Sequence, residues 1–90
     1  MRVARLIVIS GRVQGVGFRW FTHEAATREG VKGWVRNLPD GRVEALVEGD
    51  EEAVTRVERA LRAGPRSAHV DTVSVDDQEP GGYRSFTIER

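Results

Sequence analysis

Residues 3–30 read VARLIVISGRVQGVGFRWFTHEAATREG. The stretch 3–9 is almost entirely apolar and rich in β-branched side chains, which is typical of a central β-strand. From Phe18 the period changes, because apolar or small residues recur at i, i+3, i+4, i+7 and i+8 and form one stripe on a helix. Gly30 follows this stripe as a C-terminal helix cap. The sequence therefore predicts a strand, a glycine-rich loop and a helix in succession.

A β-hairpin is predicted next. Residues 32–37 have the pattern of a second strand, and residues 38–41, LPDG, form a strong turn sequence. Residues 42–49 alternate between apolar and polar side chains, which closes the hairpin. This alternation places Val43, Ala45 and Val47 on one face and Arg42, Glu44 and Glu48 on the other.

The rest of the chain completes a familiar element order. Asp50 is a good N-cap for a second helix, which Gly64-Pro65 ends. Valines within residues 70–75 mark a fourth strand, and residues 86–88 a short terminal strand. The order β-α-β-β-α-β predicts an α+β, ferredoxin-like split βαβ sandwich, with two helices on one face of an antiparallel sheet and a short extra C-terminal strand. We expect residues 1–90 to form a single domain.

Composition and charge exclude several kinds of site. The chain has no cysteine and only two histidines, far apart in sequence, so we expect no metal site and no disulfide. Its 14 basic and 14 acidic residues balance, which argues against a broad nucleic-acid surface. No apolar run approaches the roughly 20 residues that span a bilayer, and the N-terminal stretch lacks a signal-peptide cleavage pattern. We expect a cytoplasmic monomer without a nucleic-acid or membrane partner.

The loop at residues 10–19, SGRVQGVGFR, has the features of an anion site. Backbone N–H groups at a helix N-terminus are unpaired, and the helix dipole there favours negative charge. Gly11, Gly15 and Gly17 remove side chains that would keep a ligand away from the backbone. Arg19 lies where a cation is unfavourable unless an anion joins it, and its guanidinium binds two phosphate oxygens at once. The pattern favours a phosphoryl group.

The spacing differs from those of two common phosphate loops. The Gly-Lys-Ser/Thr ending of an NTPase loop is missing, and Trp20 stands where a dinucleotide-binding loop has its third glycine. On the residues alone, a tight strand-to-helix connection is an equally good interpretation.

Two stretches resemble the signature of the acylphosphatase family: residues 11–19, GRVQGVGFR, and residues 33–44, GWVRNLPDGRVE. The resemblance extends over essentially the whole chain, including its length and order of elements. It implies hydrolysis of an acyl phosphate, a small-molecule substrate, to a carboxylate and inorganic phosphate. It also implies that no metal, cofactor or covalent intermediate takes part.

The same resemblance implies roles for individual residues. Arg19 would bind the phosphoryl group together with loop N–H groups, and Asn37 would hold the attacking water. Without the resemblance, Asn37 would be interpreted as a turn residue. We expect the strands at 3–9 and 32–37 to run antiparallel, so the element order permits Arg19 and Asn37 to meet but does not require it. The phosphate-binding set is Gln14, Gly15, Val16, Gly17, Phe18 and Arg19.

So small a set is sufficient for an acyl phosphate. The leaving group is a carboxylate, whose conjugate acid has a pKa of about 4, so it departs as a stable anion without a general acid. Phosphoryl transfer through a loose transition state is promoted mainly by positioning and electrostatic stabilisation. A phosphate monoester has a poor alkoxide leaving group, so its hydrolysis would need catalytic groups that these residues do not supply.

The remaining aromatic and histidine residues are expected to be structural. His23 and His69 are interpreted as surface residues, and Trp20 and Trp34 as packing or partly exposed aromatics rather than as ligand-stacking groups. Nothing beyond the phosphate loop indicates an acyl-group pocket, which favours broad specificity.

Other functions fit the same element order. An RNA-recognition domain stacks bases on aromatics of its central strands, but residues 3–9 and 43–49 contain none. A non-catalytic ferredoxin-like module that binds phosphate or a small regulatory molecule would explain the loop without requiring Arg19 and Asn37 to meet. An acylphosphatase-like module of a larger maturation enzyme is a third alternative. Phosphate release from benzoyl phosphate separates an enzyme from a binding module.

Overall fold

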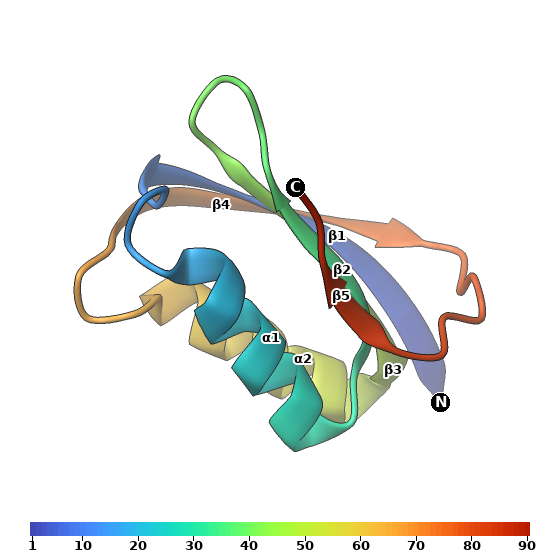
Figure 1. Ribbon diagram of the computed structural model, residues 1–90. Helices are drawn as coiled ribbons and strands as arrows, with labels where there is room; N and C mark the ends of the chain where they lie inside the picture. Colours follow the sequence, from blue (N-terminus) through green and yellow to red (C-terminus); the bar gives the residue numbers. More distant parts are fainter.

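The computed structural model describes residues 1–90 and contains every element that the sequence predicts (Figure 1). The ferredoxin-like order is confirmed, and neither helix is long and apolar enough to cross a membrane. The elements are β1 (Arg2–Arg12), α1 (Phe18–Glu29), β2 (Lys32–Asn37), β3 (Val43–Asp50), α2 (Glu51–Ala63), β4 (His69–Gln78) and β5 (Phe86–Ile88).

The five strands form one sheet in the order β4-β1-β3-β2-β5. Both β1 and β2 pair antiparallel with β3, so they run parallel to each other, and the expectation that they are antiparallel is wrong. The strand β3 lies between them and α1 crosses over from one to the other, which is the geometry of a split βαβ unit. The C-terminal ends of β1 and β2, Arg12 and Asn37, therefore lie at the same edge of the sheet.

The last strand extends the sheet differently from the others. Residues of β5 pair parallel with β2, with Gly33 opposite Phe86 and Val35 opposite Ile88. The four longer strands form the predicted antiparallel sheet, and the parallel pairing of the short extra strand makes the five-stranded sheet mixed. This pairing brings the C-terminal segment to the edge at which β2 ends.

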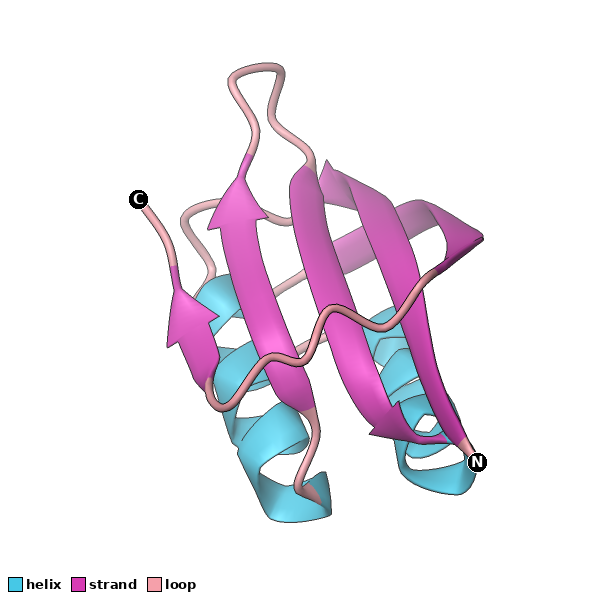
Figure 2. Ribbon diagram, turned by 90° about the vertical axis from the view of Figure 1, so that its right-hand side faces the viewer, coloured by secondary structure: helices cyan, strands magenta, loops and turns pink.

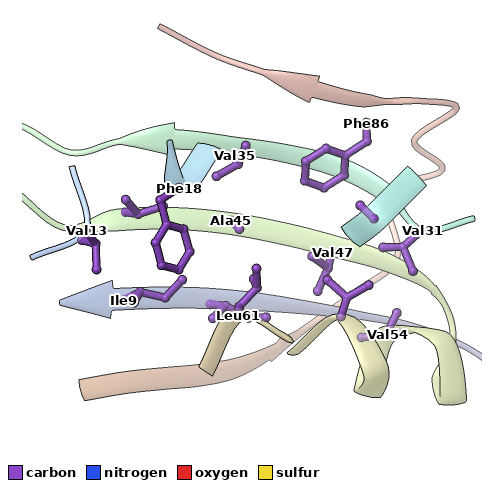
Figure 3. Close-up of a cluster of buried hydrophobic side chains, with 14 of the residues drawn as sticks. Ile9, Val13, Phe18, Val31, Val35, Ala45, Val47, Val54, Leu61 and Phe86 are labelled. Carbon is purple, nitrogen blue, oxygen red and sulfur yellow. The ribbon is translucent and has the colours of Figure 1, made fainter. Parts of the chain in front are cut away.

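Both helices cover one face of the sheet (Figure 2). The hydrophobic core lies between these layers, and Val43, Ala45 and Val47 are completely buried there, as the alternation of β3 predicts. Val13 and Phe18, which flank the glycine loop, lie together at one end of the core (Figure 3). Both side chains are only 1% exposed, so the loop is anchored in the core on either side.

The opposite face of the sheet holds a buried carboxylate. Glu48 lies on the face opposite Val43, Ala45 and Val47, as the alternation predicts, and its side chain is 0% exposed there because the segment between β4 and β5 crosses this face (Figure 2). Its carboxylate accepts a 2.8 Å hydrogen bond from Nη2 of Arg2 and further bonds from the backbone N–H groups of Gly81, Gly82 and Tyr83. Burial opposes ionisation, but these donors outweigh it and hold the pKa of Glu48 below its usual value.

Candidate active site

A cavity of about 720 Å³ opens where the glycine loop, the start of α1, the end of β2 and the C-terminal segment meet. It contains both candidate catalytic residues, Arg19 and Asn37, each of them partly buried. Of the other residues in the predicted phosphate set, the lining includes three and omits Gln14 and Val16. The lining residues are Val13, Gly15, Gly17, Phe18, Arg19, Trp20, Asn37, Ile88 and Arg90.

The direction of the strands explains why Arg19 and Asn37 meet. Since β1 and β2 are parallel, the loop that leaves β1 emerges at the edge where β2 ends. That loop spans only residues 13–17 before α1 begins, so Arg19, the second residue of the helix, stays at this edge. The topology alone therefore brings the helix start to the last residue of β2.

The backbone of the loop is shaped by two glycines. Gly15 and Gly17 have φ angles of 73° and 77°, in the left-handed region that other residues rarely adopt. A Cβ at either position would meet no atom within 4 Å, so glycine is required by the backbone angle and not by crowding. None of the backbone N–H groups of residues 14–19 donates to an acceptor within the chain. The loop thus presents a row of free donors beside the N-terminus of α1.

Two side chains hold this loop in place. Gln14 Nε2 donates to the carbonyl oxygens of Leu38, at 2.8 Å, and Arg42, at 2.9 Å, and so ties the loop to the hairpin turn. On the other side, Ser67 Oγ donates to the carbonyl oxygen of Val16 at 3.1 Å. The sequence predicted Gln14 in the phosphate loop, but its side chain anchors that loop. Ser67 carries no sequence signal for this role.

Arg19 is oriented without being neutralised. Its Nη1 donates to the carbonyl oxygen of Glu89 at 3.1 Å, which is its only hydrogen bond to the protein. Arg19 also forms no ion pair, unlike Arg2, Arg5 and four other arginines, which pair with carboxylates. Since a guanidinium carries five N–H donors, most of those of Arg19 remain available to a ligand.

The side chain of Asn37 has no hydrogen-bond partner in the chain. The following turn closes without it: Leu38 N–H donates to the Arg42 carbonyl at 2.8 Å, and Arg42 N–H donates to Asp40 Oδ1 at 3.1 Å. Hydrogen bonding from the backbone N–H of Arg42, together with the Arg42 guanidinium, holds the pKa of Asp40 below its usual value, although desolvation opposes this shift. Asp40 therefore supplies the turn contact that the alternative interpretation assigned to Asn37.

Four cavity residues were missed by the sequence analysis: Val13, Trp20 as a cavity-lining group, Ile88 and Arg90. Ile88 and Arg90 reach the cavity only through the pairing of β5 with β2, which no local pattern indicates. His23 is half-buried rather than on the surface, since it packs beside Trp20. No group of three or more histidine, aspartate or glutamate side chains is arranged to hold a metal ion.

Comparison with known proteins identifies the family. The family model described as Acylphosphatase matches residues 5–88. This chain belongs to the acylphosphatase family. The acylphosphatase of Anaeromyxobacter dehalogenans is 57% identical over 81 residues, which cover 90% of this chain and 87% of that protein. The acylphosphatase of Trichormus variabilis is 50% identical over 84 residues, covering 93% and 83% respectively.

The fold agrees with that of a solved acylphosphatase. The crystal structure of acylphosphatase from Bacillus subtilis matches with a TM-score of 0.95 and 38% sequence identity, covering 98% of this chain and 99% of that one. The resemblance inferred from residues 11–19 and 33–44 is therefore confirmed. In this acylphosphatase-family chain, both stretches contribute residues to one cavity.

Proposed function

We propose that the protein is an acylphosphatase, which hydrolyses the carboxyl-phosphate bond of acyl phosphates to a carboxylate and inorganic phosphate. The observation that carries this proposal is one cavity in which unpaired backbone N–H groups, an arginine without a carboxylate partner and a free asparagine amide converge. Membership of the acylphosphatase family supports the same activity.

Phosphate binding falls to Arg19 and the loop. The guanidinium bonds two phosphoryl oxygens, and the N–H groups of residues 14–19 bond the others. These donors are fixed before substrate arrives, because Gln14 and Ser67 hold the loop and Glu89 orients Arg19. Such preorganised donors stabilise the charge that spreads over the equatorial oxygens in the transition state.

Hydrolysis then requires a water opposite the leaving carboxylate. The Asn37 amide holds this water, since its carbonyl accepts a water hydrogen and its NH₂ donates to an oxygen. The water oxygen forms the new bond to phosphorus, while the bond from phosphorus to the acyl oxygen breaks and its electron pair stays on the carboxylate. The proton released by the water passes to a phosphate oxygen or to solvent. No covalent enzyme intermediate forms.

We propose that this reaction needs neither a general acid nor a metal ion. The departing carboxylate is already stable as an anion, because its conjugate acid has a pKa of about 4. The positive charge of Arg19 and the dipole at the start of α1 stabilise the phosphoryl oxygens, which is a metal's usual task in phosphoryl transfer. The cytoplasmic location, the monomeric state and the lack of nucleic-acid and membrane partners remain predictions.

Phosphate release from benzoyl phosphate tests the function. An acylphosphatase turns this substrate over many times per active site, with inorganic phosphate as a competitive product inhibitor. A phosphate-binding regulatory module would bind inorganic phosphate in calorimetry but release none from benzoyl phosphate above the uncatalysed rate. That second result would reject the proposed enzyme and retain the binding site.

A further inference from the structure

We infer that Trp20 and Ile88 form the acyl-group subsite of this cavity, and that the preferred substrates are acyl phosphates with an aromatic or bulky apolar acyl group. The inference rests on the proposed function, because it assigns the other end of the substrate held by Arg19. It replaces the expectations that Trp20 is a packing or partly exposed aromatic rather than a ligand-stacking group, and that no residue beyond the phosphate loop forms an acyl-group pocket.

The cavity is larger than a phosphoryl group requires. Its volume of about 720 Å³ lies in the range of pockets that hold whole small-molecule ligands, roughly 300–1,000 Å³. A phosphoryl group, with its few atoms, occupies only the part beside Arg19 and the loop. The rest of the cavity is available to the acyl group, which must leave the phosphorus on the side away from the attacking water.

Exposed apolar side chains gather at this cavity. Four large hydrophobic residues of the protein are exposed: Met1, Trp20, Tyr83 and Ile88. Two of the four, Trp20 at 62% and Ile88 at 38%, line the cavity that contains Arg19. Large apolar groups that stay exposed together in a cavity commonly mark a ligand-binding surface.

The indole of Trp20 is held in place by a stack of rings that reaches the core. Trp20 stacks on His23, with ring centroids 5.7 Å apart and an interplanar angle of 14°. His23 in turn packs edge-on against Phe86, at 6.1 Å and 66°. Phe86 is only 8% exposed, and it begins the strand that carries Ile88. The indole of Trp20 is therefore held in position before an acyl group binds, which reduces the entropy lost on binding.

The cavity combines positive charge with apolar surface in its lining. Its only charged side chains are Arg19 and Arg90, and it has no aspartate or glutamate side chain in its lining. An anionic phosphoryl group beside Arg19 and an apolar acyl group against Trp20 satisfy both parts of this surface. Aromatic rings bind an indole face or edge with a gain beyond simple area burial, so an aromatic acyl group benefits more than an acetyl group.

Stable phosphonate analogues test the subsite without turnover. We expect the parent protein to bind benzoylphosphonate more tightly than acetylphosphonate in calorimetry. The Trp20→Ala variant should weaken benzoylphosphonate binding about three- to tenfold, while the affinities for acetylphosphonate and inorganic phosphate change by less than about twofold. Trp20→Phe should restore most of the loss. Trp34→Ala is the matched control, because Trp34 lies outside the cavity, against Arg36 and Tyr83.

Ile88→Ser, a second variant, keeps the test decisive if Trp20→Ala fails to fold. It should weaken benzoylphosphonate selectively and by a smaller factor. Equal affinity of the parent for the two phosphonates, or equal weakening of both by Trp20→Ala, would overturn the subsite. Failure of the proposed function has a different signature: selective phosphonate binding with no phosphate release from benzoyl or acetyl phosphate. The subsite alone would be rejected by a different result: the protein releases phosphate from both benzoyl and acetyl phosphate, and its preference between them is the same in the parent and in Trp20→Ala, Trp20→Phe and Ile88→Ser.

Discussion

Arg19 Nη1 donates a 3.1 Å hydrogen bond to the backbone carbonyl of Glu89, seventy residues further along the chain. Glu89 is itself fixed, because its N–H donates to the carbonyl of Val35 at 2.8 Å. The acceptor on Glu89 is a neutral carbonyl and not its carboxylate, so the guanidinium is oriented while its charge remains available to an anion. The C-terminal segment is thereby part of the candidate site.

The anchoring of the loop by Gln14 leads to the first prediction. Gln14→Ala removes two hydrogen bonds to backbone carbonyls, so the free energy of unfolding should fall by about 1–3 kcal/mol. The affinity for inorganic phosphate should fall as well, because the loop N–H groups lose their fixed arrangement. Denaturant unfolding and calorimetry measure the two effects. Gln78→Ala, at the exposed end of β4, is the control, and parent-like values for Gln14→Ala would reject the anchoring role.

Glu48 makes stability depend on pH. Its folded pKa lies below the usual 4.5, so the stabilisation that its ionised form contributes is fully present above about pH 4.5. That stabilisation is lost as the pH falls through the folded pKa, when Glu48 takes up a proton in the folded state as well. We therefore expect the free energy of unfolding to decrease with acidification below pH 4.5, and Glu48→Gln to reduce this slope.

Denaturant titrations between pH 3 and pH 7 measure that slope. Glu48→Gln should also be less stable than the parent at pH 7, because an amide replaces the carboxylate that faces Arg2 and three backbone N–H groups. Glu44→Gln is the matched control: Glu44 lies on the same face of β3 and pairs only with the half-exposed Arg36, so its loss should cost less. An unchanged slope in Glu48→Gln would show that Glu48 does not govern acid stability.

Replacement of Asn37 should reduce catalysis without reducing phosphate binding. Asn37→Ala should remain folded and bind inorganic phosphate within about twofold of the parent, while kcat falls by a hundredfold or more through lost positioning of water. Steady-state kinetics and calorimetry on one preparation measure both quantities. In the control Asp40→Ala, the turn loses its contact to the Arg42 N–H, so stability should fall while kcat is retained. The opposite pattern, with kcat lost in Asp40→Ala and kept in Asn37→Ala, would show that Asn37 is a turn residue and not a catalytic one.

Removal of metal ions should leave activity intact. The proposed reaction uses the guanidinium of Arg19 and the loop N–H groups for the phosphoryl oxygens, and the carboxylate leaves without help. After prolonged EDTA treatment and dialysis, kcat for benzoyl phosphate should equal the untreated value. A loss of activity that magnesium or zinc restores would point to a different mechanism.

Local sequence patterns predict the elements of this fold well, because each depends on neighbouring residues. The start of α1 at Phe18 and the limits of β2 and β5 match the pattern of apolar residues and turns. The relative direction of β1 and β2 was wrong, since it depends on how α1 crosses over the sheet. The burial of Glu48 was also missed, because its donors in residues 81–83 lie more than thirty residues away.

The candidate site was also predictable only where it depends on neighbouring residues. The glycine loop and Arg19 were identified from local chemistry, as a helix N-terminus with small residues and a misplaced cation. Asn37 was assigned only through the family resemblance, since an asparagine before Leu-Pro-Asp-Gly is as well explained by the turn. Ile88 and the fixed orientation of Trp20 depend on the placement of β5, and no spacing along the chain records that contact.

The rate of benzoyl phosphate hydrolysis by Arg19→Lys tests the central claim most directly. Lysine keeps the positive charge but loses the planar fork that bonds two phosphoryl oxygens, so kcat/KM should fall by about a hundredfold or more. Arg28→Lys, in the last turn of the same helix and outside the cavity, should retain the parent value. A folded Arg19→Lys protein with kcat/KM within about twofold of the parent would contradict the assignment of this cavity as the phosphoryl site.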